Sequence, residues 1–327
     1  MVMLAMRFDL RNPAMAGVTM ADRYAAMIDM AEWAEQHGGV AIALCEHHGS
    51  DDGYLPNPLL LAAAVAARTK TIRINIASLV GPFHHPLRLA EDLAVLDHLT
   101  RGRVDVTISG GYALHEFEMF GVPLKERPKR MTRLLKTLKQ AWTAEPFDYE
   151  GRTVQVTPAP LREGGPPLTM GGSSEGAARR AARIADGFLP SEPRFWDYYV
   201  DELAKLGKPD PGPHFAGSNQ TTYLAEDVEK GWEELGPYFL HESTSYGTWG
   251  ETAGVANPYK VTHDLGELRA TGIYRIITPG QMVAELRAMG DFAFAFMHPM
   301  VGGIPPARAW QMLELFRDQV LAKMEAK

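Results

Sequence analysis

The stretch Val40-Ala41-Ile42-Ala43-Leu44-Cys45-Glu46-His47-His48-Gly49 decides how this chain of 327 residues is interpreted. Residues 40–45 are apolar throughout, which is the pattern of a parallel strand that is covered on both faces. A carboxylate and two histidines follow at once, and packing alone does not require them there. In a barrel of alternating strands and helices, side chains at such strand ends carry the chemistry. The stretch therefore predicts a buried strand that delivers Glu46, His47 and His48 to a site.

Segments with strand and helix character alternate outward from this stretch. Strands are predicted at residues 6–10, 40–45, 72–79, 104–109, 168–170, 187–189, 218–224 and 292–297. Helices are predicted at residues 21–36, 58–68, 86–101, 125–142, 174–185, 194–206, 226–235 and 307–324. Residues 147–156 predict a hairpin. This alternation implies parallel strands, and eight strand–helix pairs fit an α/β fold of the (β/α)8 TIM barrel type, formed by a single domain over residues 1–327.

An open doubly wound sheet is the alternative, but no glycine-rich dinucleotide turn follows the first strand. Residues 236–280 do not fit the repeat. They hold several glycines and the side chains of His241, Tyr246, Trp249 and Tyr259. We interpret them as a long insertion late in the barrel, and long loops in compact domains often act as lids.

Composition limits the possible functions. A hydrophobic fraction of 46% and a charged fraction of 22% are those of a globular enzyme. The net charge of −7 argues against a nucleic-acid partner, which requires a basic face. Leucines at helical spacing interrupt the basic residues between Lys125 and Lys139, so we interpret that stretch as a solvated helix face. We expect no membrane association, because no apolar run approaches the roughly 18 residues of a membrane span.

The single cysteine, Cys45, cannot form an intramolecular disulfide, which fits a reducing compartment. We expect it to be a packing residue rather than a nucleophile, because it ends an apolar strand. The first residues run into a strand without a charged region or a cleavage site. A cytoplasmic location is therefore expected.

Three groups at predicted strand ends carry chemistry. Glu46-His47-His48 offers an acid/base group whose unperturbed pKa lies near neutrality, although a pair of histidines can also simply support a loop. Residues 81–86, Gly-Pro-Phe-His-His-Pro, hold the pair His84 and His85, but His85-Pro86 also suits the start of a helix. Residues 170–174, Met-Gly-Gly-Ser-Ser, precede a helix, where free N–H groups can bind a phosphate; a plain N-cap is the other interpretation.

Four histidines in two pairs raise a metal-dependent hydrolase as a second class of function. Such a site needs three or more convergent ligands. Adjacent residues in an extended segment point to opposite sides, and no His-x-His spacing places two rings together. We therefore predict no metal site.

Several blocks of the chain resemble the bacterial luciferase-like family of flavin-dependent monooxygenases and reductases. They recur in the family's order, at residues 46–48 through 68–70, 85–92, 96–103, 117–121, 171–174, 181–188 and 278–280. The resemblance covers most of the chain and implies a (β/α)8 barrel, often dimeric, with flavin at its C-terminal mouth.

The resemblance also implies roles for individual residues. His47 matches the family's active-site histidine. Ala77-Ser78 matches a position where relatives often have a non-prolyl cis peptide under the isoalloxazine ring. Ser109 falls where relatives place a residue close to the flavin. The flavin phosphate would be held by the loop residues Gly172, Ser173 and Ser174.

One departure from the family pattern concerns the phosphate. Many relatives have an arginine after the fourth strand, whereas this chain has Gly110. Arg179 or Arg180 could compensate for the missing bidentate partner. Weaker cofactor binding would suit an enzyme that takes reduced FMN from a separate flavin reductase.

The resemblance implies a monooxygenase that uses reduced FMN and O₂ to oxidise a small organic substrate. His47 would act as acid/base, Glu46 and His48 would position it, and Tyr112 and residues 236–280 would shape the substrate pocket. A coenzyme F420-dependent oxidoreductase, which moves a hydride without O₂, is the main alternative. A flavin-binding relative without catalysis is another. The substrate does not follow from the sequence.

Overall fold

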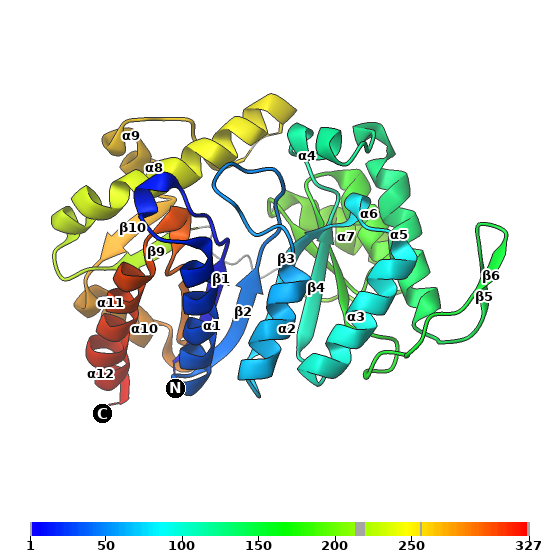
Figure 1. Cartoon of the computed structure of the whole chain (residues 1–327), viewed down its shortest axis with the longest axis horizontal. Helices are drawn as coiled ribbons and strands as arrows, with labels where there is room; N and C mark the ends of the chain where they lie inside the picture. The colour runs from blue at the N-terminus through cyan, green and yellow to red at the C-terminus, as the bar shows by residue number, and fades with distance from the viewer. Residues whose placement is uncertain (1, 213–219, 256, 326–327) are drawn as a thin grey trace.

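A single parallel sheet forms the centre of the computed structural model, which describes residues 2–212, 220–255 and 257–325 (Figure 1). Within those residues, the sheet has nine strands in the order β10-β9-β11-β1-β2-β3-β4-β7-β8, and every neighbouring pair is parallel. The strands are β1 (Met3–Phe8), β2 (Gly39–Leu44), β3 (Arg73–Val80), β4 (Val104–Ser109), β7 (Leu168–Gly172), β8 (Gly187–Pro190), β9 (Thr221–Leu224), β10 (Tyr274–Ile277) and β11 (Phe294–Met297).

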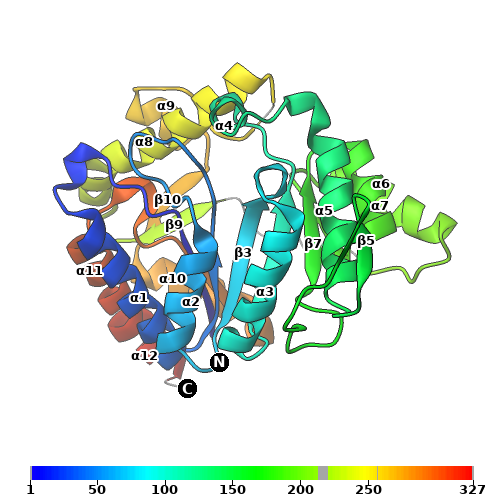
Figure 2. The same ribbon diagram turned by 45° about the vertical axis from the view of Figure 1, so that its right-hand side comes forward.

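Helices surround this sheet, and a small hairpin, β5 (Phe147–Tyr149) with β6 (Arg152–Val154), projects from it (Figures 1 and 2). Among the described residues, no helix is both long enough and apolar enough to cross a membrane. The helices are α1 (Met20–Gln36), α2 (Pro58–Arg68), α3 (Pro86–Thr100), α4 (Leu114–Met119), α5 (Arg127–Ala141), α6 (Glu175–Ile184), α7 (Arg194–Lys205), α8 (Val228–Ala253), α9 (Leu265–Ala270), α10 (Pro279–Ala288), α11 (Pro306–Phe316) and α12 (Ala322–Glu325).

The alternation of side chains along β1 shows how the strands serve both a core and a site. Leu4, Met6 and Phe8 are fully buried in the hydrophobic core. Arg7, which points to the opposite face, is only half-buried and lines a cavity. Because successive side chains on a strand point to opposite faces, one face packs and the other can carry polar groups.

The predicted α/β fold and most of its elements are confirmed, with shifted bounds. The first strand covers Met3–Phe8 rather than residues 6–10. The strand predicted at residues 218–224 begins at Thr221 among the described residues, and residues 218 and 219 lie outside them. The hairpin within residues 147–156 is present.

Residues 236–280, interpreted as a long insertion, are mostly helix and strand rather than a loop. Pro237 lies inside α8, which continues to Ala253, and the segment also contributes α9 and the strand β10, which was not predicted. Its glycines mark close packing: a Cβ on Gly236 would lie 2.5 Å from Leu265, and one on Gly247 would lie 2.9 Å from the Val261 main chain. Tertiary packing has therefore overridden the helix-breaking tendency of glycine and proline.

The helix α8 lies across one end of the sheet, next to α4, and both views place the two chain termini at the opposite end (Figures 1 and 2). The strand arrows point toward α8, so this end holds the carboxyl ends of the strands. Polar residues that follow each strand are thus gathered beneath α8, where parallel α/β folds place their ligand sites.

Glu46, the second residue after β2, ties neighbouring strand ends together. Its carboxylate is 1% exposed and accepts hydrogen bonds from the His48 ring at 3.1 Å, the His84 ring at 3.2 Å and the main-chain N–H of Val80. Burial by itself would raise the pKa of Glu46, but the hydrogen bonds from His48 and His84 lower it to about 2. The loops after β2 and β3 are therefore held by one ionised side chain.

This arrangement predicts how stability depends on pH. An unfolded Glu46 takes up a proton below its ordinary pKa of 4.5, whereas the folded carboxylate resists protonation down to about 2. Its contribution to the free energy of unfolding, on the order of 3 kcal/mol, is complete above pH 4.5 and is lost as the pH falls toward 2. In urea unfolding at a series of pH values, the stability difference between wild type and Glu46→Gln should shrink across this window.

The exposed Glu163 provides a matched control, because it makes no hydrogen bond or ion pair with a described residue. Glu163→Gln should keep the pH profile of the wild type. Parallel profiles for wild type and Glu46→Gln would show that Glu46 does not hold the two loops through its charge.

Candidate active site

A cavity of about 500 Å³ opens at the carboxyl ends of the strands. Nearly all of the residues predicted from the sequence meet in it. Those that line it are Glu46, His47, Ala77, Ser78, Ser109, Tyr112, Gly172, Ser173 and Ser174. The same cavity therefore brings together the histidine cluster and the Gly-Gly-Ser-Ser loop, which are more than 120 residues apart in the chain.

His48 is the exception, because it does not line this cavity. Its side chain is buried, its ring bonds Glu46, and it makes an edge-to-face contact with Phe120 at a centroid distance of 4.7 Å. Its main-chain N–H donates to Glu116 at 2.8 Å. His48 thus supports the loop rather than facing a ligand.

His47 forms a pair with a buried glutamate that the sequence analysis did not identify. Its Nδ1 lies 2.8 Å from Oε1 of Glu116, and the glutamate side chain is 0% exposed. A carboxylate in that position accepts the Nδ1 hydrogen and so favours the tautomer whose Nε2 is free to take a proton. Nε2 makes no hydrogen bond within the described part of the chain, so it is available to a ligand.

Aromatic side chains surround the His47 ring. Their centroids lie between 4.7 and 5.9 Å from that of His47, and they belong to Tyr54, Tyr112, Tyr246 and Trp249. Burial raises the pKa of Tyr54, Tyr112 and Tyr246, so these hydroxyls stay neutral near pH 7. The His47 ring therefore lies among aromatic side chains, and its own side chain is 13% exposed.

The floor of the cavity is made by the ends of β3, β4 and β7. The peptide bond between Ala77 and Ser78 is cis, as expected. The Ser109 hydroxyl donates to that of Ser78 at 2.7 Å. A Cβ on Gly171 would lie 2.3 Å from the Ser109 Oγ, so only glycine allows β7 to approach β4 this closely.

The Gly-Gly-Ser-Ser loop leads into α6 as predicted. Ser174 is the N-cap, and its hydroxyl accepts from the Ala177 N–H at 3.2 Å. Ser173 is exposed at the cavity wall, and Gly176 in the first turn also lines the cavity. The loop and the helix N-terminus thus present hydroxyl and N–H donors to the same space.

Two arginines stand beside this loop. Arg127, the first residue of α5, lines the cavity and donates to the Gly111 carbonyl at 2.9 Å. Its Cδ is 3.8 Å from where a Cβ on Gly110 would lie, so an arginine on α5 lies next to the position where many relatives have one. Arg180 lines the cavity as well and donates to Thr132 at 3.0 Å. Neither forms an ion pair with a carboxylate of the described residues.

These positions refine two predictions. Arg179, the other residue considered for the phosphate, pairs with Glu175 and Glu202 and does not line the cavity. The basic stretch was interpreted as a solvated helix face, but its residue Arg127 faces the cavity.

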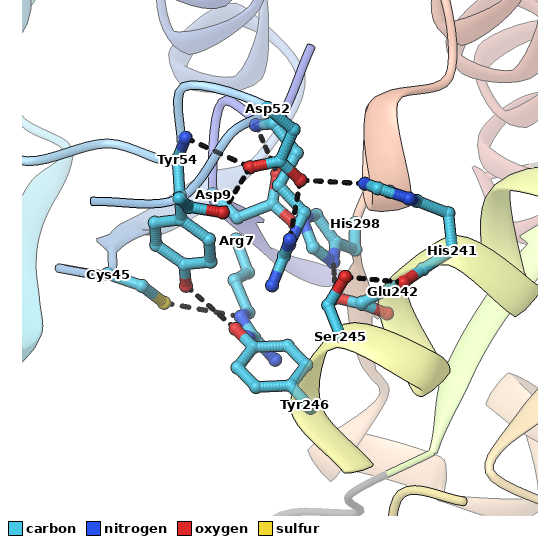
Figure 3. Close-up of polar contacts among 12 residues, drawn as sticks. Arg7, Asp9, Cys45, Asp52, Tyr54, His241, Glu242, Ser245, Tyr246 and His298 are labelled. Atoms are coloured by element: carbon cyan, nitrogen blue, oxygen red, sulfur yellow. Dashed lines mark hydrogen bonds and ion pairs between the residues drawn. The ribbon is translucent and has the colours of Figure 1, made fainter. Parts of the chain in front are cut away.

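A polar network lies beside the His47 cluster, between β1 and α8 (Figure 3). Arg7 donates to the Cys45 sulfur at 3.2 Å and to the Tyr246 hydroxyl at 2.9 Å. The Tyr246 hydroxyl is in turn 2.8 Å from that of Tyr54. Cys45 is a free, buried thiol, and it lines the cavity beside Arg7. The strand β1 thus places the Arg7 cation in the cavity wall, where it contacts Tyr246 of α8.

Next to this network, Asp52 accepts from Arg11 at 2.5 Å and lies 2.7 Å from the His241 ring. The Arg11 guanidinium is stacked near the rings of Tyr54, Tyr246 and Trp249 at 4.8–4.9 Å. Although burial by itself would raise the pKa of Asp52, its hydrogen bond with His241 and the charge of Arg11 hold it below its usual range. Arg11, unlike Arg7, is therefore neutralised by a carboxylate.

Asp9, Glu242 and His298 form a separate buried group whose possible ligand atoms lie within 4.8 Å of one another. Burial by itself would raise the pKa of Asp9, but the His298 ring and Arg11 lower it to about 2. Arg11 Nε is only 3.8 Å from the Asp9 carboxylate, so a cation already stands at this group. Neither histidine pair considered for a metal takes part in it.

Several cavity residues were missed by the sequence analysis, and the signals for them differ. Arg7 is the one charged residue in the apolar run at residues 3–8. This isolated charge in a predicted strand could have identified Arg7 as a candidate site residue. Glu116 and Arg127 lie in segments without strand periodicity, and nothing local indicates that they turn toward His47 and Gly110.

Relatives with known names match this chain over different lengths. It is 30% identical to the oxygenase component of flavin-dependent trigonelline monooxygenase of Acinetobacter baylyi over 157 residues, which cover 46% of this chain and 43% of that protein. It is 26% identical to F420-dependent glucose-6-phosphate dehydrogenase of Microbacterium testaceum over 325 residues, which cover 92% and 94%. In several other relatives the matched region likewise spans about half of the protein.

Solved structures share the fold at low sequence identity. Monooxygenase RslO1 from Streptomyces bottropensis superposes with a TM-score of 0.74 at 21% identity, covering 99% of this chain and 100% of that one. The oxygenating constituent of 3,6-diketocamphane monooxygenase from Pseudomonas putida, solved in complex with FMN, gives a TM-score of 0.69 at 19% identity and covers 98% of both chains. The likeness confirms the α/β fold.

The sequence profile of the luciferase-like monooxygenases matches residues 3–298, which include every strand of the sheet and every residue that lines the cavity. This match extends over far more than half of the chain, and the order of blocks noted in the sequence agrees with it. The chain therefore belongs to the luciferase-like monooxygenase family.

Proposed function

We propose that this protein is an FMN-dependent monooxygenase that uses reduced FMN and O₂ to oxidise a small organic substrate. One observation carries the proposal: a single cavity joins the His47–Glu116 pair to the Gly-Gly-Ser-Ser loop and to two neighbouring arginines, Arg127 and Arg180, that form no ion pair with a carboxylate of the described residues. The first group can move a proton, and the second fits a phosphate. The flavin-dependent relative named above supports the same reaction class.

The residues of the cavity fit FMN. Ser173, Ser174 and the first turn of α6 would hold the phosphate together with Arg127 and Arg180, since hydroxyl, N–H and guanidinium groups all donate to phosphate oxygens. The ring system would lie over the Ala77–Ser78 peptide, near Ser109. When bound, reduced FMN supplies the electrons, so that one atom of O₂ enters the substrate and the other leaves as water.

The chain's own part is to position and protect the reacting groups. His47 would exchange a proton through Nε2 while Glu116 holds its other nitrogen. Glu46 and His48 would keep the loop of His47 in place. Tyr112, together with the later segment that carries Tyr246, Val255, Asn257 and Tyr259, would shape the substrate pocket and exclude water.

An F420-dependent oxidoreductase is the second candidate. The observation in its favour is the match to an F420-dependent relative across 92% of this chain. The same fold and histidine would then serve a hydride transfer without O₂. We further propose a separate flavin reductase as partner, supported by the oxygenase component among the relatives, and a homodimer, which rests on the family resemblance.

Two parallel assays test the cofactor. The protein is mixed with reduced FMN in air, and separately with reduced F420 under nitrogen, each with a panel of small organic compounds. We expect mass spectrometry to find an oxygenated product only with reduced FMN and O₂. Oxidation of reduced F420 under nitrogen, without any product in the FMN assay, would assign the protein to the F420-dependent branch instead.

A second prediction concerns the phosphate. Arg127→Gln should weaken FMN binding by about tenfold or more, because it removes a charge-assisted contact, and should leave the binding of riboflavin, which lacks the phosphate, nearly unchanged. Fluorescence titration measures both affinities. Arg133→Gln, at an exposed position on the same helix, is the control and should alter neither. An equal loss for riboflavin would mean that Arg127 acts on the fold rather than on the phosphate.

A third prediction concerns His47. His47→Ala should keep FMN affinity within about threefold of the wild type but lower product formation by about 100-fold or more, as expected for loss of an acid/base group. Glu116→Gln should reduce the rate less, because the imidazole remains. His263→Ala removes an exposed histidine and serves as control. Unchanged turnover in His47→Ala would exclude His47 as the acid/base.

A further inference from the structure

Arg7 places a positive charge in the cavity wall. Its guanidinium donates to a thiol sulfur and a phenol oxygen, those of Cys45 and Tyr246 (Figure 3), and Tyr259 is a further hydrogen-bond partner. No carboxylate of the described residues forms an ion pair with it. A guanidinium has five N–H donors, more than these contacts use. Since burying an unpaired charge is costly, a residue in this state usually serves a ligand.

The carboxylates around Arg7 are engaged elsewhere. Asp52 binds Arg11 and His241. Asp9 lies between Arg11 and His298, at 3.8 and 3.5 Å. Glu46 accepts hydrogen bonds from His48 and His84, and Glu116 from His47. The chain thus neutralises the neighbouring Arg11 but leaves Arg7 available to an anion from outside.

The phosphate of FMN cannot be that anion. Arg127 and Arg180 stand beside the loop that follows β7, whereas Arg7 is on β1, and three strands lie between β1 and β7 in the sheet. The cavity therefore has guanidinium groups at two separate places. If the first place binds the cofactor's phosphate, the second is left for the substrate.

The side chains around Arg7 indicate which kind of substrate would fit beside it. Tyr246 stacks on Tyr259 with centroids 4.6 Å apart, and Tyr54 lies edge-on to His47 at 4.8 Å. Tyr246, Tyr54 and Tyr112 all contact the ring of His47 edge-on. Because Tyr259 stacks on Tyr246 and the Arg11 guanidinium lies over the Tyr54 and Tyr246 rings, these aromatic side chains would meet a ligand mainly through edge contacts, which suit an aromatic ring. The fork of an arginine matches a carboxylate in particular.

We propose that Arg7 binds the carboxylate of a small planar aromatic substrate and presents its ring to His47 and the flavin. This assignment rests on the proposed function, because it takes the phosphate site as belonging to FMN. It makes Arg7 a specificity-determining residue: the aromatic side chains would contact the ring of the substrate, and Arg7 would select the substrates that are anions.

The test uses pairs of probes of nearly equal shape in which a neutral amide replaces the carboxylate, benzoate with benzamide and nicotinate with nicotinamide. Each is titrated calorimetrically into the FMN-loaded protein. In the wild type, we expect the carboxylate of each pair to bind at least about tenfold more tightly than the amide. In Arg7→Gln, the carboxylate affinity should fall by about 30-fold or more while the amide affinity stays the same.

Two further variants serve as controls for this test. Arg152→Gln, on the exposed hairpin, is the matched control and should keep the preference for carboxylates. If Arg7→Gln does not fold, Arg7→Lys keeps the charge and loses the fork, and should lower carboxylate affinity at least about threefold. FMN affinity, measured without probes, shows separately whether the proposed function holds.

The outcomes are distinct. Failure to bind FMN contradicts the proposed function. Normal FMN binding with no preference for carboxylates in the wild type overturns the assignment of Arg7 alone. The assignment is also overturned if the preference persists in the Arg7 variants, or if these variants weaken only the binding of reduced FMN, which would place Arg7 at the flavin ring instead.

Discussion

Glu46 accepts hydrogen bonds from the Val80 main chain and from the rings of His48 and His84, so one side chain at the end of β2 also fixes the end of β3. The histidine side of the site is built around this contact. It sets the course of the loop in which His47 turns toward Glu116, and it places the start of α3 beside the Ala77–Ser78 strand. A buried carboxylate can do this only while it is ionised and fully paired, because an unpaired buried charge is strongly unfavourable.

The parallel architecture could be predicted because each strand carries its own signal. An apolar run such as residues 40–45 must be covered on both faces, and the prolines at Pro58 and Pro86 mark helix starts that the structure reproduces. The same prediction from short stretches of sequence failed at Gly236 and Pro237. There the glycines permit close packing of α8 on neighbouring segments, and this is a property of tertiary contacts that no window of sequence reveals.

The site could be predicted only where function coincides with a strand end. His47, Ser109 and the loop at Gly172 follow apolar runs, and the structure brings them to one cavity. Glu116 and Arg127 lie in or next to short helical segments after β4 and reach the cavity through the fold of that region. The departure at Gly110 suggested a weak grip on a phosphate. In the structure an arginine from a different element, Arg127 at the start of α5, lies next to Gly110, a proximity that sequence position does not reveal.

The distribution of charge in the cavity explains why so acidic a protein can suit anionic ligands. The net charge of −7 belongs to the whole chain, whereas three arginines in the cavity wall, Arg7, Arg127 and Arg180, make no ion pair with a carboxylate of the described residues. Low-dielectric walls strengthen the electrostatic field of such charges. The potential inside the cavity can therefore be positive although the net charge of the chain is negative. Leaving them unneutralised costs stability, whereas the neighbouring Arg11 is neutralised by Asp52. If Arg7 binds a substrate carboxylate, as we propose, the contrast between Arg7 and Arg11, four residues apart, separates an arginine for binding from one for structure.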